Sequence, residues 1–92
     1  MVAQIIKIVL DVLKPREPPL HEFASKLVSM HGVEHVGISL GEIDQNTESV
    51  KVTLEGNEIL MDSVRKHLEG LGAAIHSIDE VSVVRRKPTP TH

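Results

Sequence analysis

The sequence predicts an α+β fold in which four strands and two helices follow the order strand, helix, strand, strand, helix, strand. Three observations indicate this order: β-branched residues that alternate with polar ones, two segments with apolar residues at helical spacing, and turn-forming residues between them. The chain has 92 residues, which is the size of one domain. We expect residues 1–84 to form that domain and residues 85–92 to be a basic tail containing prolines.

The first strand is predicted over residues 3–13. Its even-numbered residues from 6 to 12 are all apolar, which is typical of a face turned toward a core. Three prolines between residues 15 and 19 end it, because proline cannot donate a hydrogen bond to a neighbouring strand. The other face is mixed and contains Ile5, Lys7, Val9, Asp11 and Leu13.

Two amphipathic helices follow from apolar residues spaced three and four apart. Residues 20–28 predict the first, and residues 60–71 the second, with Gly56–Asn57 before it as a possible N-cap. The remaining strands are predicted over residues 36–43, 49–55 and 75–84, and the turn residues Asp44–Thr47 join the first two of these into a hairpin.

This order is the split βαβ, or ferredoxin-like, pattern. Right-handed crossovers then give an antiparallel sheet with strand order 4-1-3-2 and both helices on one face. We expect the opposite face to be apolar and therefore to contact another protein. The residues that we place on that face are Ile5, Val9, Leu13, Ile43, Ile75, Val81 and Val83.

Composition argues against several functions. The chain has no cysteine, which excludes disulfides and thiolate metal sites. Residues 1–84 carry a net charge of −6, and Phe23 is the one aromatic residue, so a nucleic acid is not an expected partner. No apolar stretch approaches the length of a membrane span, and the first residues lack a signal-peptide pattern. We expect a cytoplasmic protein that does not contact membranes.

Acidic residues and one histidine are the candidate metal ligands. They come from four segments that the predicted topology brings toward one end of the sheet. Carboxylates suit Ca²⁺, with Mg²⁺ as the alternative, and the histidine would also admit Zn²⁺ or Mn²⁺. A solvated acidic rim explains the same residues equally well. The candidate ligands are Asp11, Glu42, Asp44, Glu48, His76 and Asp79.

The sequence gives less support for a catalytic pair or an anion-binding site. His76 and Ser77 are adjacent on a strand and point to opposite faces, which excludes them as a catalytic pair. Lys14–Arg16 could contact an anion, but Glu17 follows and no glycine-rich loop supports the site. We therefore interpret Lys14–Arg16 as a solvated loop.

Several short motifs in fixed order resemble a family of short archaeal proteins, the domain of unknown function 211 family, over residues 5–84. The resemblance implies a ferredoxin-like fold, ring-like homo-oligomers and bound divalent metal such as calcium, with no established activity. It maps an acidic signature onto Asp11, Glu42, Asp44, Glu48 and Asp79. The motifs are Asp11–Pro15, Gly32–Val33, Ile38–Leu40, Glu42–Asp44, Thr47–Glu48, Val50–Thr53, Glu55–Gly56 and Ile75–Val81.

Three functions are compatible with these observations. The first is a non-enzymatic homo-oligomeric module with a divalent cation in the acidic cluster. The second is a regulatory domain that binds an unknown small molecule, like the amino-acid-sensing domains of the same topology. The third, which the sequence supports least, is a metal-dependent hydrolase with His76 as its base.

Overall fold

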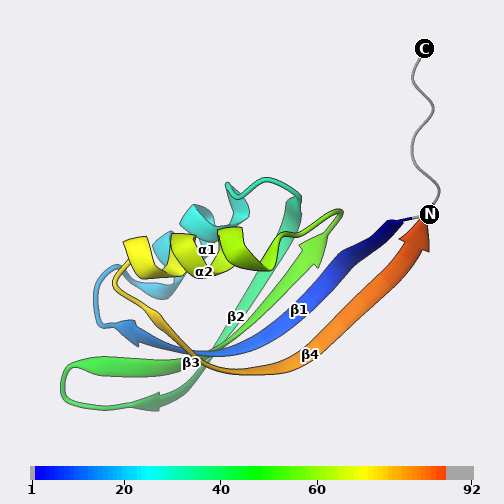
Figure 1. Cartoon of the computed structure of the whole chain (residues 1–92). Coiled ribbons are helices and arrows are strands. Elements are labelled where there is room, and N and C mark those ends of the chain that lie inside the picture. Colours follow the sequence, from blue (N-terminus) through cyan, green and yellow to red (C-terminus); the bar gives the residue numbers. More distant parts are fainter. Residues whose placement is uncertain (1, 87–92) are drawn as a thin grey trace.

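The computed structural model describes residues 2–86 and confirms the predicted fold class (Figure 1). Four strands and two helices alternate in the expected order. The last strand continues two residues past its predicted end, and the remainder of the predicted tail, residues 87–92, lies outside the described residues. The elements are β1 (Val2–Pro15), α1 (Leu20–Val28), β2 (Val33–Ile43), β3 (Thr47–Gly56), α2 (Met61–Gly70) and β4 (Ala74–Arg86).

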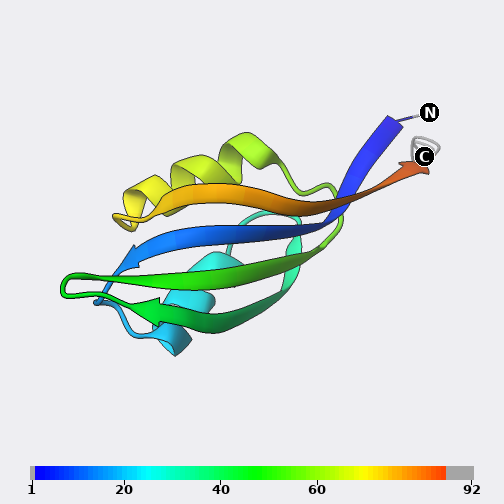
Figure 2. The same ribbon diagram turned by 90° about the horizontal axis from the view of Figure 1, so that it is seen from below.

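The strands form one antiparallel sheet in the order β2-β3-β1-β4, which is the predicted order counted from the opposite edge. Both helices cover the same face of this sheet (Figures 1 and 2). At one end β1 continues beyond β3, so that Val2–Ile5 pairs with β4 alone. The strand order makes β2 and β4 the two edge strands of the sheet, and β4 is the longer of the two.

The core lies between the sheet and the helices and is almost wholly aliphatic. Phe23 of α1 is fully buried at its centre, as the helical spacing predicts. Alternate residues of the two central strands meet it, because successive side chains of a strand point to opposite faces. The other fully or almost fully buried core residues include Ile8, Leu10, Val12, Leu27, Val50, Val52, Leu54, Val64 and Leu68.

The open face of the sheet differs from its prediction, since polar residues dominate it. Lys7, Val9 and Asp11 of β1 mark three rows that cross the sheet on this side. The residues paired with them in the other strands are His35, Gly37, Ser39, Lys51, Thr53, Glu55, Ser77, Glu80 and Ser82. Val9 and Leu13 lie on the open face as predicted. Val81 and Val83 do not, because they pair with Ile8 and Ile5 on the helix side, and the prediction of an apolar open face is therefore wrong.

Irregular pairing between β1 and β4 explains the error for two residues. Register shifts interrupt this ladder between Ile5 and Lys7, between Val9 and Leu10, and between Asp11 and Val12. Each shift inserts an extra residue and reverses the strict alternation of side chains. As a result Ile5 and Ile75 pack against the core rather than lying on the open face.

The start of α2 also differs from the prediction. Leu60 is its N-cap residue, has no side-chain cap hydrogen bond, and is 56% exposed. Asn57 does not cap the helix, because its backbone N–H donates to the Gly32 carbonyl at 2.8 Å and its side-chain oxygen accepts from Arg86. Asn57 therefore ties the end of β3 to the start of β2 and to the end of β4.

Candidate functional site

The six predicted metal ligands fall into two groups in the structure. Glu42 and Asp44 are exposed at the β2–β3 hairpin, where the Asp44 backbone N–H donates to the Thr47 carbonyl at 2.8 Å. Glu48 follows at the start of β3. The second group lies on the two strands at the other edge of the sheet and comprises Asp11 of β1 with His76 and Asp79 of β4.

Asp11 and Glu48 lie on opposite faces of the sheet. Glu48 pairs with Lys14 and is in phase with Val50 and Val52 of the core, whereas Asp11 pairs with Lys51 on the open face. In the second group, the Ser77 hydroxyl donates to Asp79 Oδ1 at 2.8 Å, and Ser77 pairs with Asp11. Within residues 2–86, no three His, Asp or Glu side chains come close enough together to hold a metal ion.

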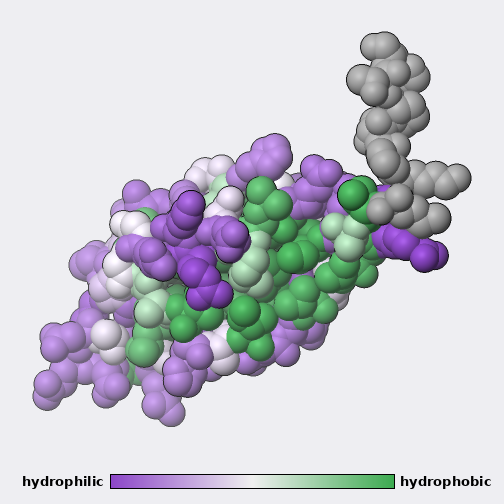
Figure 3. Space-filling model, viewed as in Figure 1, coloured by the Kyte–Doolittle hydropathy of each residue, from purple (hydrophilic) through white to green (hydrophobic). Residues whose placement is uncertain are grey.

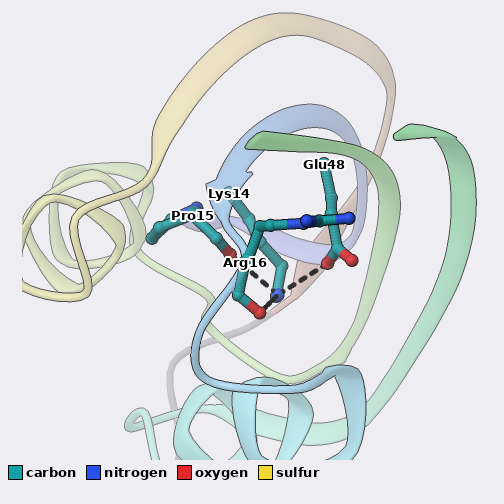
Figure 4. A network of polar contacts seen from close by, with 4 residues as sticks. All are labelled: Lys14, Pro15, Arg16 and Glu48. Atoms are coloured by element: carbon teal, nitrogen blue, oxygen red, sulfur yellow. Dashed lines mark hydrogen bonds and ion pairs between the residues drawn. The ribbon is translucent and has the colours of Figure 1, made fainter. Parts of the chain in front are cut away.

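A buried ion pair occupies the position where the sequence suggests a solvated loop (Figure 4). The Lys14 side chain is 0% exposed, and its Nζ lies 2.8 Å from Oε1 of Glu48. The same Nζ donates to the carbonyls of Pro15 at 2.9 Å and Arg16 at 3.3 Å, and it lies 5.6 Å from the centre of the Phe23 ring. The interpretation of Lys14 as solvated is wrong.

These contacts limit what Lys14 and Glu48 can do. An ammonium group has three donors, and three acceptors surround this one. Lys14 therefore has no free donor for an anion, and Glu48 already balances a buried charge. The even-numbered phase of β1, which passes through Leu10 and Val12, continues to Lys14, so the pattern contained the signal for its burial.

Three exposed apolar residues of the sheet lie near one another along β4. Others of similar exposure lie on β1 and β2, namely Val2, Leu13, Leu40 and Ile43. Ile78, Val81 and Val83 are 43%, 43% and 53% exposed, and we call them the β4 edge patch. Their partners in β1 are Leu10, Ile8 and Ile5, which belong to the core or pack against it, so the patch lies on the helix side. Figure 3 shows apolar side chains gathered on this side of the molecule.

The short α2 explains why this patch is exposed. Its ten residues span about 15 Å, whereas the 13 residues of β4 span about 43 Å. The helix ends next to the start of β4, where Ala73 donates its N–H to the Leu68 carbonyl. It therefore covers the first part of β4 and leaves the second part uncovered (Figure 2).

An open groove lies between the start of β1 and the segment that leads into α2. Its volume is about 620 Å³, and residues 2–5 and 58–63 line it together with His31. Ile5 and Ile59 form its floor, where the Ile59 N–H donates to the Ile5 carbonyl at 3.0 Å. Glu58 contributes a carboxylate that accepts a 2.8 Å hydrogen bond from the Gln4 amide. No sequence motif identified this groove.

The comparisons with known proteins agree with the motifs. A family model described as uncharacterised ArCR, the domain of unknown function 211, matches residues 6–87, which is most of the chain. The chain belongs to this family. An uncharacterised protein of Methanocaldococcus jannaschii is similar to it, with 51% identity over 77 residues that cover 84% of this chain and 79% of the relative. The resemblance inferred from the sequence is confirmed, and neither name states an activity.

The described part of the chain has no membrane-crossing candidate among its helices, since neither α1 nor α2 is both long and apolar enough.

Proposed function

We propose that this member of the domain of unknown function 211 family is a non-enzymatic module that acts as a homo-oligomer. The β4 edge patch is the observation that carries the proposal. Clustered apolar side chains on a protein surface favour association, because burying them removes apolar area from water. A second copy of the chain is the partner because the same edge offers unpaired backbone groups to an identical strand.

The backbone of β4 supports the same proposal. It lies at the edge of the sheet, so that one side of a 13-residue strand has no partner strand within residues 2–86. Proteins commonly protect such an edge with prolines, charges or a covering element, since an unprotected edge pairs readily with another chain. From Ile78 to Val83 this strand has no proline, and three of its six residues form the β4 edge patch, while Asp79 and Glu80 are its two charged residues.

Light scattering after size-exclusion chromatography at micromolar concentration tests the proposal. We expect a mass of at least two chains for the wild type. Val81→Lys should shift the mass toward one chain, because a charge replaces an apolar side chain at the interface. Val28→Lys is the matched control, since Val28 is a 41% exposed valine on α1, away from β4. A monomeric wild type at these concentrations would disprove the proposal.

A regulatory domain that binds a small molecule is the second candidate, and the groove lined by residues 2–5 and 58–63 is the observation that favours it. Such a ligand would raise the melting temperature. A thermal-shift screen of amino acids and nucleotides tests this, with Gln4→Ala as a variant that changes the groove wall. A screen in which no compound shifts the melting temperature counts against this candidate.

The divalent cation and the cytoplasmic location stay predictions. Within one chain two candidate ligands border Ser77, with Asp11 beside it in the ladder and Asp79 hydrogen-bonded to it. Two carboxylates supply fewer oxygen ligands than the six to eight that calcium takes, so a second copy or water would have to supply the others. The proposal of a bound divalent cation therefore has less structural support than the proposal of a homo-oligomer.

A further inference from the structure

The first residues of β1 have an unpaired backbone edge. Pairing between β1 and β4 begins at Val2, whereas pairing between β1 and β3 begins only at Lys7. On the side of β1 that faces β3, residues 2–4 therefore have no partner strand within the described part of the chain. Figure 1 shows this part of β1 projecting with β4 past the end of β3.

The direction of the free backbone groups follows from one hydrogen bond. The Ile5 carbonyl accepts the N–H of Ile59, which follows the end of β3, at 3.0 Å, so the backbone groups of Ile5 point away from β4. Backbone groups of successive strand residues alternate in direction, and the ladder with β4 is regular from Val2 to Ile5. Ala3 therefore directs its N–H and its carbonyl to the same side as Ile5.

A turn after β3 moves the chain away from this edge and opens the groove. Glu58 has a left-handed backbone conformation with φ 52°, and the preceding Asn57 is tied to the Gly32 carbonyl. The chain then enters α2 instead of continuing beside β1. The groove between residues 2–5 and 58–63 has a volume of about 620 Å³, which is within the range of about 300–1,000 Å³ typical of ligand sites.

The groove combines apolar walls with negative charge. Ile59 is buried at its floor, and Val2 and Leu60 are exposed on its walls. Glu58 and Asp62 contribute carboxylates, and the described residues that line the groove include no lysine or arginine. Asp62 also stabilises the first turn of α2, since a negative charge is favourable at the start of a helix. Glu58 is therefore the main candidate for contact with a positively charged ligand.

We infer that the groove binds a short peptide in an extended conformation, which adds to the edge of β1 as a further strand. The peptide backbone accepts the Ala3 N–H and donates to the Ala3 carbonyl, and an aliphatic side chain contacts Leu60. A lysine of the peptide pairs with Glu58, whose carboxylate accepts one hydrogen bond from Gln4 and has the capacity for more. This inference rests on the second candidate function, a ligand in this groove, and names the class of that ligand.

The chemistry of the groove favours a peptide over the other small molecules of the proposed screen. A strand edge presents an N–H and a carbonyl at the spacing of another peptide backbone, which is the basis of recognition by strand addition. A free amino acid has no amide group to pair with both. A nucleotide would place its phosphates beside the carboxylates of Glu58 and Asp62, and like charges repel.

Calorimetric titration with synthetic peptides tests the inference. The probe is a capped tetrapeptide of valine, lysine, valine and valine, added to the full chain. We expect saturable binding that weakens when single amide nitrogens of the peptide are methylated. The loss should occur at alternate positions only, because alternate N–H groups of an added strand face β1.

A variant of β1 tests the same contact from the side of the protein. Ala3→Pro removes the N–H that faces the groove and spares the hydrogen bonds between β1 and β4, so the peptide should bind about tenfold more weakly. Ala3→Ser retains this N–H and is the matched control, which should bind as the wild type does. Circular dichroism and urea denaturation confirm that both variants are folded.

The contact with Glu58 has its own test. Glu58→Gln keeps an oxygen for the hydrogen bond with Gln4 and removes the charge, so it should weaken binding of the lysine peptide by about fivefold, as for an exposed ion pair. A peptide with norleucine in place of lysine is the control, and its affinity should not change. Equal losses for the two peptides would overturn the charged contact.

The remaining outcomes separate this inference from the second candidate function. No binding at peptide concentrations up to roughly 1 mM overturns the inference, and the thermal-shift screen still decides whether another ligand binds. Binding that neither alternate methylation nor Ala3→Pro weakens overturns the strand addition. An affinity that falls as the chain associates would mean that a second copy fills the groove, which also overturns the inference.

Discussion

The Lys14–Glu48 pair and the β4 edge patch differ in solvent exposure in the opposite way from what their polarity would suggest. At the end of β1 an ammonium group is 0% exposed and is surrounded by acceptors. On β4 three apolar side chains are roughly half exposed although they lie beside core residues. The same sheet thus buries a charge in one place and exposes apolar area in another.

The difference follows from which helix covers each position. Phe23 of α1 lies over Lys14, so the end of β1 is enclosed, and a lysine there must have acceptors. The short α2 leaves the second half of β4 uncovered. The buried pair therefore contributes to the stability of one chain, and the patch is the surface through which we propose that copies of the chain associate.

The largest expected effect comes from breaking the buried pair. Glu48→Ala leaves the Lys14 charge without its carboxylate and should lower the free energy of unfolding by about 3–5 kcal/mol. Urea denaturation followed by circular dichroism measures the change. Glu55→Ala is the matched control, since the Glu55 carboxylate is 51% exposed beside His35 and its loss should cost less than about 1 kcal/mol.

A double variant sharpens this result. Lys14→Met with Glu48→Leu removes both charges and keeps their volume, so its stability should return to within about 1–2 kcal/mol of the wild type. If Glu48→Ala and Glu55→Ala destabilise the protein equally, the Lys14–Glu48 pair contributes no more than a surface contact does.

An intermediate effect is expected at the β4 edge patch. Val81→Lys combined with Val83→Lys should change the unfolding free energy of the single chain by less than about 0.5 kcal/mol, because both residues are exposed. The same variant should abolish association. Urea denaturation at low protein concentration and sedimentation at high concentration measure the two quantities. A large loss of single-chain stability would mean that the patch is part of the core.

The smallest expected effect concerns calcium. Calorimetric titration should give a weak heat of binding that Asp11→Asn with Asp79→Asn removes, because these carboxylates border Ser77. Asp44→Asn is the control from the hairpin group. An equal response from the wild type and the Asp11–Asp79 variant would identify the acidic residues as a solvated rim.

The elements of the fold were predictable from local pattern, and α1 shows why. Phe23 and Leu27 lie four residues apart and are both buried, which is the relation that helical periodicity encodes. The face of Ile5 and Ile75 was not predictable, because it depends on bulges that form only when β1 pairs with β4. The arrangement of the candidate metal ligands was not predictable for a related reason. Asp11 and Glu48 lie on adjacent strands, but on opposite faces of the sheet.

The element order, the aliphatic core around Phe23 and the family follow from the amino-acid sequence alone. These depend on residue periodicity, turn chemistry and motif order, all of which are local along the chain. The burial of Lys14, the polar character of the open face and the exposure of Ile78, Val81 and Val83 on β4 became visible only in the tertiary structure. These depend on which helix covers which strand and on how bulges shift the register. Both are properties of contacts between segments far apart in the chain.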